Sequence, residues 1–77
     1  MAKPNPDHPV WLSTALVQRT EASTSMEWRF AVRAATWRTA QQKVLKLAQR
    51  RYRNRFGNWD QPHVIAVGAL LKFDAVE

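Results

Sequence analysis

The sequence contains no cysteine among its 77 residues. Disulfides, thiolate nucleophiles and metal sites built on thiolates are therefore excluded, and the composition fits a reducing compartment. No apolar run approaches the roughly 18 residues of a membrane span. Residues 1–9 also lack the apolar core that a secretory signal needs. We expect a cytoplasmic protein that does not enter a membrane.

Groups that could carry catalysis are scarce. The two glycines, Gly57 and Gly68, cannot form the loop that cradles a nucleotide phosphate. His8 lies in the N-terminal segment and His63 opens a predicted strand, where a surface role is usual. The six carboxylates are scattered along the chain, and there is no His-x-x-x-His motif to hold a metal. We expect no enzymatic activity, no metal and no cofactor.

Acidic residues are absent from Trp28 through Trp59, although the chain has a net charge of +6. Nine of the twelve basic residues fall in that interval: Arg29, Arg33, Arg38, Lys43, Lys46, Arg50, Arg51, Arg53 and Arg55. Concentrated positive charge attracts polyanions or an acidic protein face. A solvated surface that only keeps the protein in solution is the alternative interpretation.

The chain is nevertheless apolar enough to fold, since 45% of its residues are hydrophobic and four are tryptophan. A chain of this length has material for one thin core. We expect a flexible, proline-rich tail over residues 1–9 and a single domain over residues 10–77.

Alternation of apolar and polar residues predicts two N-terminal strands, over Val10–Arg19 and from Met26 to Ala34, joined by a turn rich in serine and threonine. A third strand is predicted over His63–Phe73. One of its sides is Ile65, Val67, Ala69, Leu71 and Phe73. The other side is nearly as apolar, a pattern typical of a central strand.

A helix is predicted between the second and third strands. Thr36 is a candidate N-cap, and Gly57 is a candidate end signal. The expected buried stripe follows three- and four-residue steps, with Leu45 and Tyr52 at its margin. Its members are Ala40, Val44, Leu47 and Ala48.

The order β-β-α-β then predicts an α+β fold. Because the helix must return over the sheet, the last strand runs parallel to the second and antiparallel to the first. Placed beside the first strand, it gives a three-stranded antiparallel sheet of order 2-1-3 with one amphipathic helix on one face.

The strongest functional pattern is a basic stripe on this helix. Lys43, Lys46, Arg50 and Arg53 recur at helical spacing, within about 80° of arc and along about 15 Å. Phosphates or acidic side chains could lie against such a row. Arg51 and Arg55 extend the charge around the end of the helix, where guanidinium groups can bind phosphate or carboxylate in bidentate fashion.

A second basic patch is expected on the sheet. Arg29 and Arg33 lie on the face of the second strand opposite Trp28, so they would decorate the side that the helix leaves open. Binding of single-stranded nucleic acid there would require exposed aromatic rings. Trp59, in a polar loop, is the best candidate for an exposed interface aromatic. Three further tryptophans are expected in or at the border of the core: Trp11, Trp28 and Trp37.

One helix can cover only one side of the sheet, yet the first and third strands are apolar on both sides. A contiguous exposed apolar patch usually marks an interface. We therefore expect a homodimer or a protein partner, bound through the open sheet face or an edge strand.

The stretch from Val10 to Phe73 resembles a small bacterial family of uncharacterised β-β-α-β domains. The resemblance lies in Val10-Trp11, in Ala35-Thr36 with Ala40, and in the segment from Tyr52 to Gly57. It implies the same fold but no activity and no site residues. This helix is far more basic than the family pattern.

The sequence thus predicts a non-enzymatic binding module whose basic helix engages an anionic partner, with nucleic acid the leading hypothesis. The alternative is a small adaptor or inhibitor, of bacterial or phage origin, that binds an acidic protein surface and could dimerise.

Overall fold

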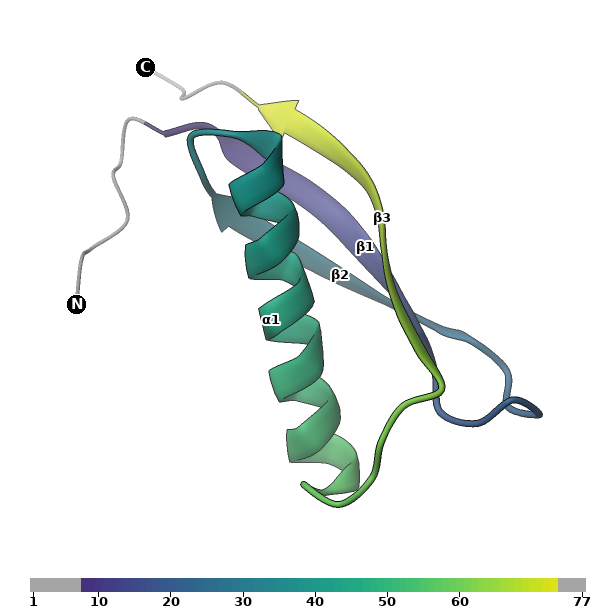
Figure 1. Ribbon diagram of the computed structural model, residues 1–77. Helices are drawn as coiled ribbons and strands as arrows, with labels where there is room; N and C mark the ends of the chain where they lie inside the picture. Colours follow the sequence, from purple (N-terminus) through teal and green to yellow (C-terminus); the bar gives the residue numbers. More distant parts are fainter. Residues whose placement is uncertain (1–7, 74–77) are drawn as a thin grey trace.

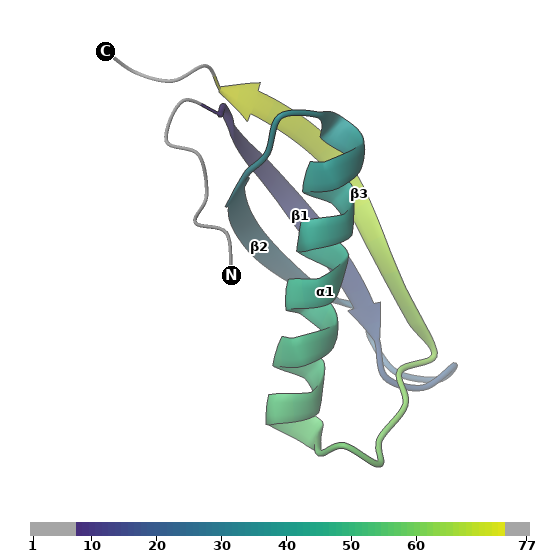
Figure 2. The same cartoon turned by 60° about the vertical axis from the view of Figure 1, so that its left-hand side comes forward.

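The computed structural model describes residues 8–73 as three strands and one helix. The elements are β1 (Val10–Gln18), β2 (Met26–Arg33), α1 (Trp37–Phe56) and β3 (Val64–Phe73). The strands form one antiparallel sheet of order β2-β1-β3, and α1 lies across one of its faces (Figures 1 and 2). The predicted α+β fold and strand order are confirmed.

The predicted N-terminal tail is described only at its end, because residues 1–7 lie outside the described range, as do residues 74–77. The amide of Ala34 donates to the carbonyl of Pro9 at 3.2 Å. The guanidinium of Arg33 donates to the carbonyl of His8 at 3.0 Å. These bonds hold the two residues before β1 against the end of β2.

β1 is the central strand, since it pairs with both β2 and β3. Its side chains alternate between the face under α1, where Trp11, Ala15 and Val17 are buried, and the opposite face, where Leu12 and Leu16 are exposed. β3 is an edge strand, so the prediction of a central strand from its two apolar sides is wrong. Its second apolar side lies on the face that α1 leaves open.

A bulge divides β3. Ser13 lies opposite Leu70, but Ala15 lies opposite Val67, so β3 has one extra residue beside Thr14. Such an insertion reverses the alternation of side chains beyond it. Ile65 and Val67 before the bulge and Leu70 after it pack towards the core.

The bulge corrects the predicted faces of this strand. Leu71 and Phe73 pair with Leu12 and Val10, on the face opposite the core. The prediction that they share a side with Ile65 is therefore wrong, because strict alternation fails where a residue is inserted.

Both predicted helix boundaries are confirmed. Thr36 has an extended backbone, and its side-chain oxygen accepts from the amide of Thr39 at 3.3 Å. At the other end, Gly57 has φ of 97°, and its amide donates to the carbonyl of Arg53 at 2.8 Å. Glycine suits this position because a side chain would strain a backbone with positive φ.

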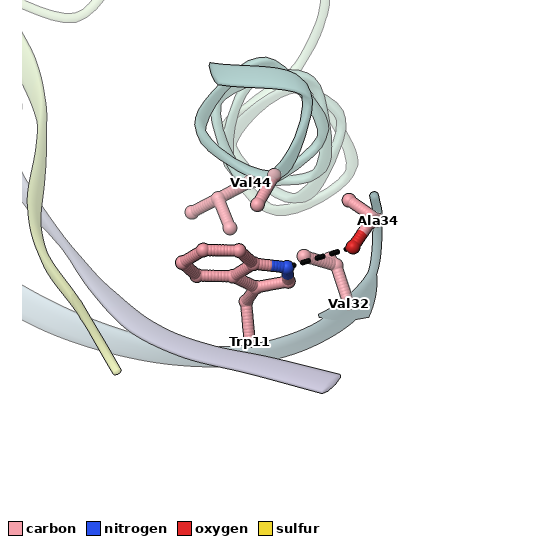
Figure 3. Packing of buried hydrophobic residues seen from close by; sticks show 5 residues of the cluster. Trp11, Val32, Ala34 and Val44 are labelled. Carbon is pink, nitrogen blue, oxygen red and sulfur yellow. Dashed lines mark hydrogen bonds between the residues drawn. The ribbon is translucent and has the colours of Figure 1, made fainter. Parts of the chain in front are cut away.

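The core lies between α1 and the sheet in two clusters. The first surrounds Trp11, whose ring lies against Val44 of α1 and Val32 of β2 (Figure 3). The second contains Trp28 of β2 and Tyr52 of α1. The two predicted core tryptophans of the sheet are thus buried, whereas Trp37 is 54% exposed.

The buried line of α1 differs from the predicted stripe. It follows Ala40, Val44, Ala48 and Tyr52 at four-residue steps. Tyr52, expected at the margin, is only 1% exposed, whereas Leu47 is 37% exposed. Each step of four residues rotates 40° beyond a full turn, so the line of buried residues shifts around the helix axis. Leu47 therefore lies beside this line and not on it.

Candidate anion-binding surface

The helix α1 carries seven basic residues and no acidic one. The ion pairs between side chains of residues 8–73 join Arg19 to Asp60 and Arg29 to Glu27, so none involves a cation of α1. The positive charge of the helix is therefore not neutralised by carboxylates from the described part of the chain.

Three members of the predicted basic stripe line one groove between α1 and the edge of β2. This basic groove has a volume of about 370 Å³. It is lined by Val32, Arg33, Lys43, Lys46, Leu47 and Arg50. The ammonium of Lys43 donates to the backbone carbonyl of Arg33 at 2.6 Å, which ties the helix to the end of β2. Lys46 and Arg50 are exposed beside it.

The groove combines charge with apolar surface. Val32 is 8% exposed and belongs to the core, and Leu47 lies on the helix between the two exposed cations. An apolar floor lowers the local dielectric, so a phosphate or carboxylate held there interacts more strongly with nearby cations than it would on an open surface.

The fourth member of the stripe, Arg53, is exposed but does not line this groove. It borders a separate cavity of about 750 Å³ between α1 and the connection to β3. That cavity is lined by Leu45, Gln49, Tyr52, Arg53, Asn58, Asp60, Gln61, Pro62 and Ile65. The predicted row of four therefore divides between two surfaces, because it winds around the helix relative to the sheet.

Two further predicted cations contact aromatic rings. The guanidinium carbon of Arg51 lies 5.0 Å from the ring centroid of Trp28, and that of Arg55 lies 5.5 Å from the centroid of Phe56. Such cation–π contacts orient the side chains over the sheet and the helix end. Both residues remain exposed, so their charge still adds to the field of the basic groove.

The basic patch predicted on the sheet is small. Arg29 lies on the open face, 3.9 Å from the carboxylate of Glu27. Arg33 belongs to the same side of β2 by alternation but donates to His8 and also borders the basic groove. These two arginines therefore do not form a surface of their own.

The carboxylate of Asp60 is held away from the basic groove. It accepts from Nε of Arg19 at 2.9 Å and from the hydroxyl of Tyr52. The hydrogen bond from Arg19, followed by that from Tyr52, lowers the pKa of Asp60. Burial, with the hydrogen bond to Asp60, raises the pKa of Tyr52. This trio joins the residue directly after β1, α1 and the loop before β3, and nothing in the spacing of its members predicted it.

Trp59 is 97% exposed, as its position in a polar loop predicted. Its neighbours Asn58 and Asp60 line the cavity that Arg53 borders.

Among residues 8–73, no group of three or more histidine and carboxylate side chains is placed to hold a metal ion. The helix of the described residues, α1, is too polar to span a membrane.

Comparison of the chain with protein-family models, with curated proteins and with solved structures gave no match. The resemblance to a family of β-β-α-β domains therefore stays a prediction.

Proposed function

We propose that this domain binds the phosphate backbone of a nucleic acid through the basic groove. One observation carries the proposal. Lys43, Lys46 and Arg50 line a single groove with an apolar floor, and no carboxylate of residues 8–73 pairs with them. A surface of this kind attracts a chain of regularly spaced negative charges.

The dimensions favour a short stretch of backbone. From Lys43 to Arg50 the helix rises roughly 10 Å. Laid parallel to the axis of a duplex, this length corresponds to about three phosphates of one strand, at 3.4 Å of axis for each. If three phosphates are neutralised, log K should fall with log salt with a slope of about −3 for duplex DNA and about −2 for single strands.

Trp59 supports the choice of nucleic acid. A tryptophan with nearly all of its ring surface in water can stack on an unpaired base, which contributes about 1–3 kcal/mol per base in proteins that bind single strands. The ring follows the C-terminal end of α1, and Arg53 and Arg55 supply positive charge there.

The test measures fluorescence anisotropy of labelled single-stranded DNA, duplex DNA and RNA over a range of salt concentrations. The variant Lys46→Glu/Arg50→Glu should lose at least about tenfold in affinity at low salt, and its salt slope should decrease in magnitude by about 2.

The matched control is Arg38→Glu/Lys72→Glu, which changes the net charge equally at two exposed residues that line neither the groove nor the hollow of the open sheet face. It should bind more tightly than the groove variant. Equal losses in both variants would show that net charge alone drives binding. No binding to any nucleic acid at low salt would contradict the proposal and favour an acidic protein surface as the partner.

A further inference from the structure

The face of the sheet opposite α1 is apolar over two of its three strands. Residues paired across an antiparallel sheet lie on the same face, so the register assigns its members. β1 contributes Leu12 and Leu16, and β3 contributes Leu71 and Phe73. These four side chains are between 40% and 61% exposed. No element of residues 8–73 covers this open face, as both ribbon views show (Figures 1 and 2).

We propose that a second copy of this chain covers the open face, giving a dimer in which two sheets pack face to face. This proposal is independent of nucleic-acid binding, which uses the other side of the molecule.

The shape of the open face suits a self-complementary interface. In a two-fold dimer the same patch must supply both projections and the hollow that receives them. Leu71 and Phe73 are large and half exposed, whereas Ala31 and Ala69 are small. The alanines help to line a shallow hollow of about 350 Å³ that runs from β2 across β1 to β3.

The distribution of charge also favours a second copy in this arrangement. The charged groups of the open face lie on β2, at one edge, where Glu27 and Arg29 already pair with each other. Two copies centred on β1 and β3 would bury the leucines and leave β2 at the wetter rim. A polar rim around an apolar centre is the usual anatomy of a protein interface.

The basic helices do not oppose this dimer. Each α1 lies on the far side of its own sheet, so about 10 Å per layer separates the two helix axes by roughly 30 Å. That separation is several times the screening length of about 8 Å at physiological salt, so repulsion between the helices is weak.

The area of the open face determines the expected affinity of the dimer. Three strands of this length span roughly 14 by 30 Å, or about 400 Å² in plan on each partner and about 800 Å² on the two together, which is the size of a weak, transient interface. We therefore expect a dimer that dissociates on dilution through the micromolar range.

Sedimentation equilibrium of the full chain tests the proposal. The wild type should approach twice the 8.9 kDa mass of one chain at high concentration and dissociate on dilution. Leu71→Asp should remain monomeric, because the change places a charge at the centre of the interface. The matched control Trp59→Asp makes the same kind of change at an exposed residue away from this face and should still dimerise. A monomeric wild type at about 1 mM, or a Leu71→Asp dimer, would overturn the proposal.

A distance measurement on an otherwise wild-type chain distinguishes face packing from edge pairing. The chain has no cysteine, so Gln42→Cys on the exposed side of α1 provides a single site for a spin label. Face-to-face packing predicts labels about 30 Å apart or farther. Antiparallel pairing of edge strands would place both helices on one face of a continuous sheet, roughly 15 Å apart, and would contradict the proposal.

Discussion

The indole nitrogen of Trp11 donates a 2.8 Å hydrogen bond to the backbone carbonyl of Ala34, and both residues are buried (Figure 3). The bond joins the central strand to the segment between β2 and α1. It fixes the chain where it turns from the sheet to the helix. It also satisfies a carbonyl that would otherwise be costly to bury.

Trp11→Phe should lower the free energy of unfolding by about 2–4 kcal/mol. The substitution leaves a buried acceptor without its donor and leaves a cavity where the larger ring packed. Urea denaturation followed by circular dichroism measures the loss. Trp37→Phe is the control, since Trp37 is 54% exposed, and it should change stability by no more than about 0.5 kcal/mol. Equal losses in the two variants would show that the indole bond contributes little.

Gly68→Ala should destabilise the domain by about 1–3 kcal/mol, because the added Cβ would lie 2.8 Å from Oγ1 of Thr14 and 3.2 Å from its carbonyl oxygen. Thermal or urea denaturation measures the change. Thr14→Ala removes the nearer of these two atoms. Gly68→Ala should therefore lower the free energy of unfolding less in the Thr14→Ala background than in the wild type. If the effects of the two substitutions simply add, β3 moves away from Thr14 instead.

Acid should destabilise the domain partly through Asp60. Its pKa is lowered in the folded state, so its contribution is present above the unfolded value of about 4 and is lost as the pH falls below that value. Asp60→Asn should be less stable than wild type near neutral pH and should show a flatter dependence on pH below about 4. Denaturant titrations at several pH values compare the two proteins. Parallel pH profiles would rule out a role for Asp60 in acid unfolding.

Arg50→Glu should leave the folded domain as stable as wild type at low salt, or more stable by about 0.5 kcal/mol, although we expect it to weaken the proposed binding. The change relieves repulsion with Lys46, four residues earlier on the helix. Arg51→Glu is the comparison, and it should be destabilising because it removes the cation–π contact with Trp28. Added salt should narrow the difference between Arg50→Glu and wild type. A marked loss of stability in Arg50→Glu would show that the groove cations have a structural role.

The sequence predicted the element order and both helix ends, because these depend on local chemistry. The strand order followed from the requirement that the helix return over the sheet. Thr36 and Gly57 act through their own backbone and the adjacent turn. Alternation identified the buried side of β2 correctly, and it placed Trp28 in the core.

The errors arose where the packing of the elements against one another determines which side chains are buried. Gly68 sits at a bulge beside Thr14, and periodicity cannot show an inserted residue, so Leu71 and Phe73 were assigned to the wrong face. Likewise, the path of α1 across the sheet determines that Tyr52 is buried and Leu47 lines the groove.

The candidate site was predicted in part. Lys43, Lys46 and Arg50 do share a surface, as their spacing indicated. Arg33 joins them only because β2 ends beside α1, a neighbourhood that helical spacing cannot reveal. Arg53 lies on a different surface, beside the connection to β3, because the basic row winds around α1 relative to the sheet.

The pairing of β1 with β3 has a kinetic consequence. Val10, at the start of the sheet, pairs with Phe73, at its end, so the central strand gains its second neighbour only after nearly the whole domain is available. The hairpin of β1 and β2 can form earlier from local contacts, whereas closing the long loop to β3 costs chain entropy before any contact compensates it. We expect docking of β3 to be the slow step in folding, and until it occurs one edge of β1 is open to pairing with another chain.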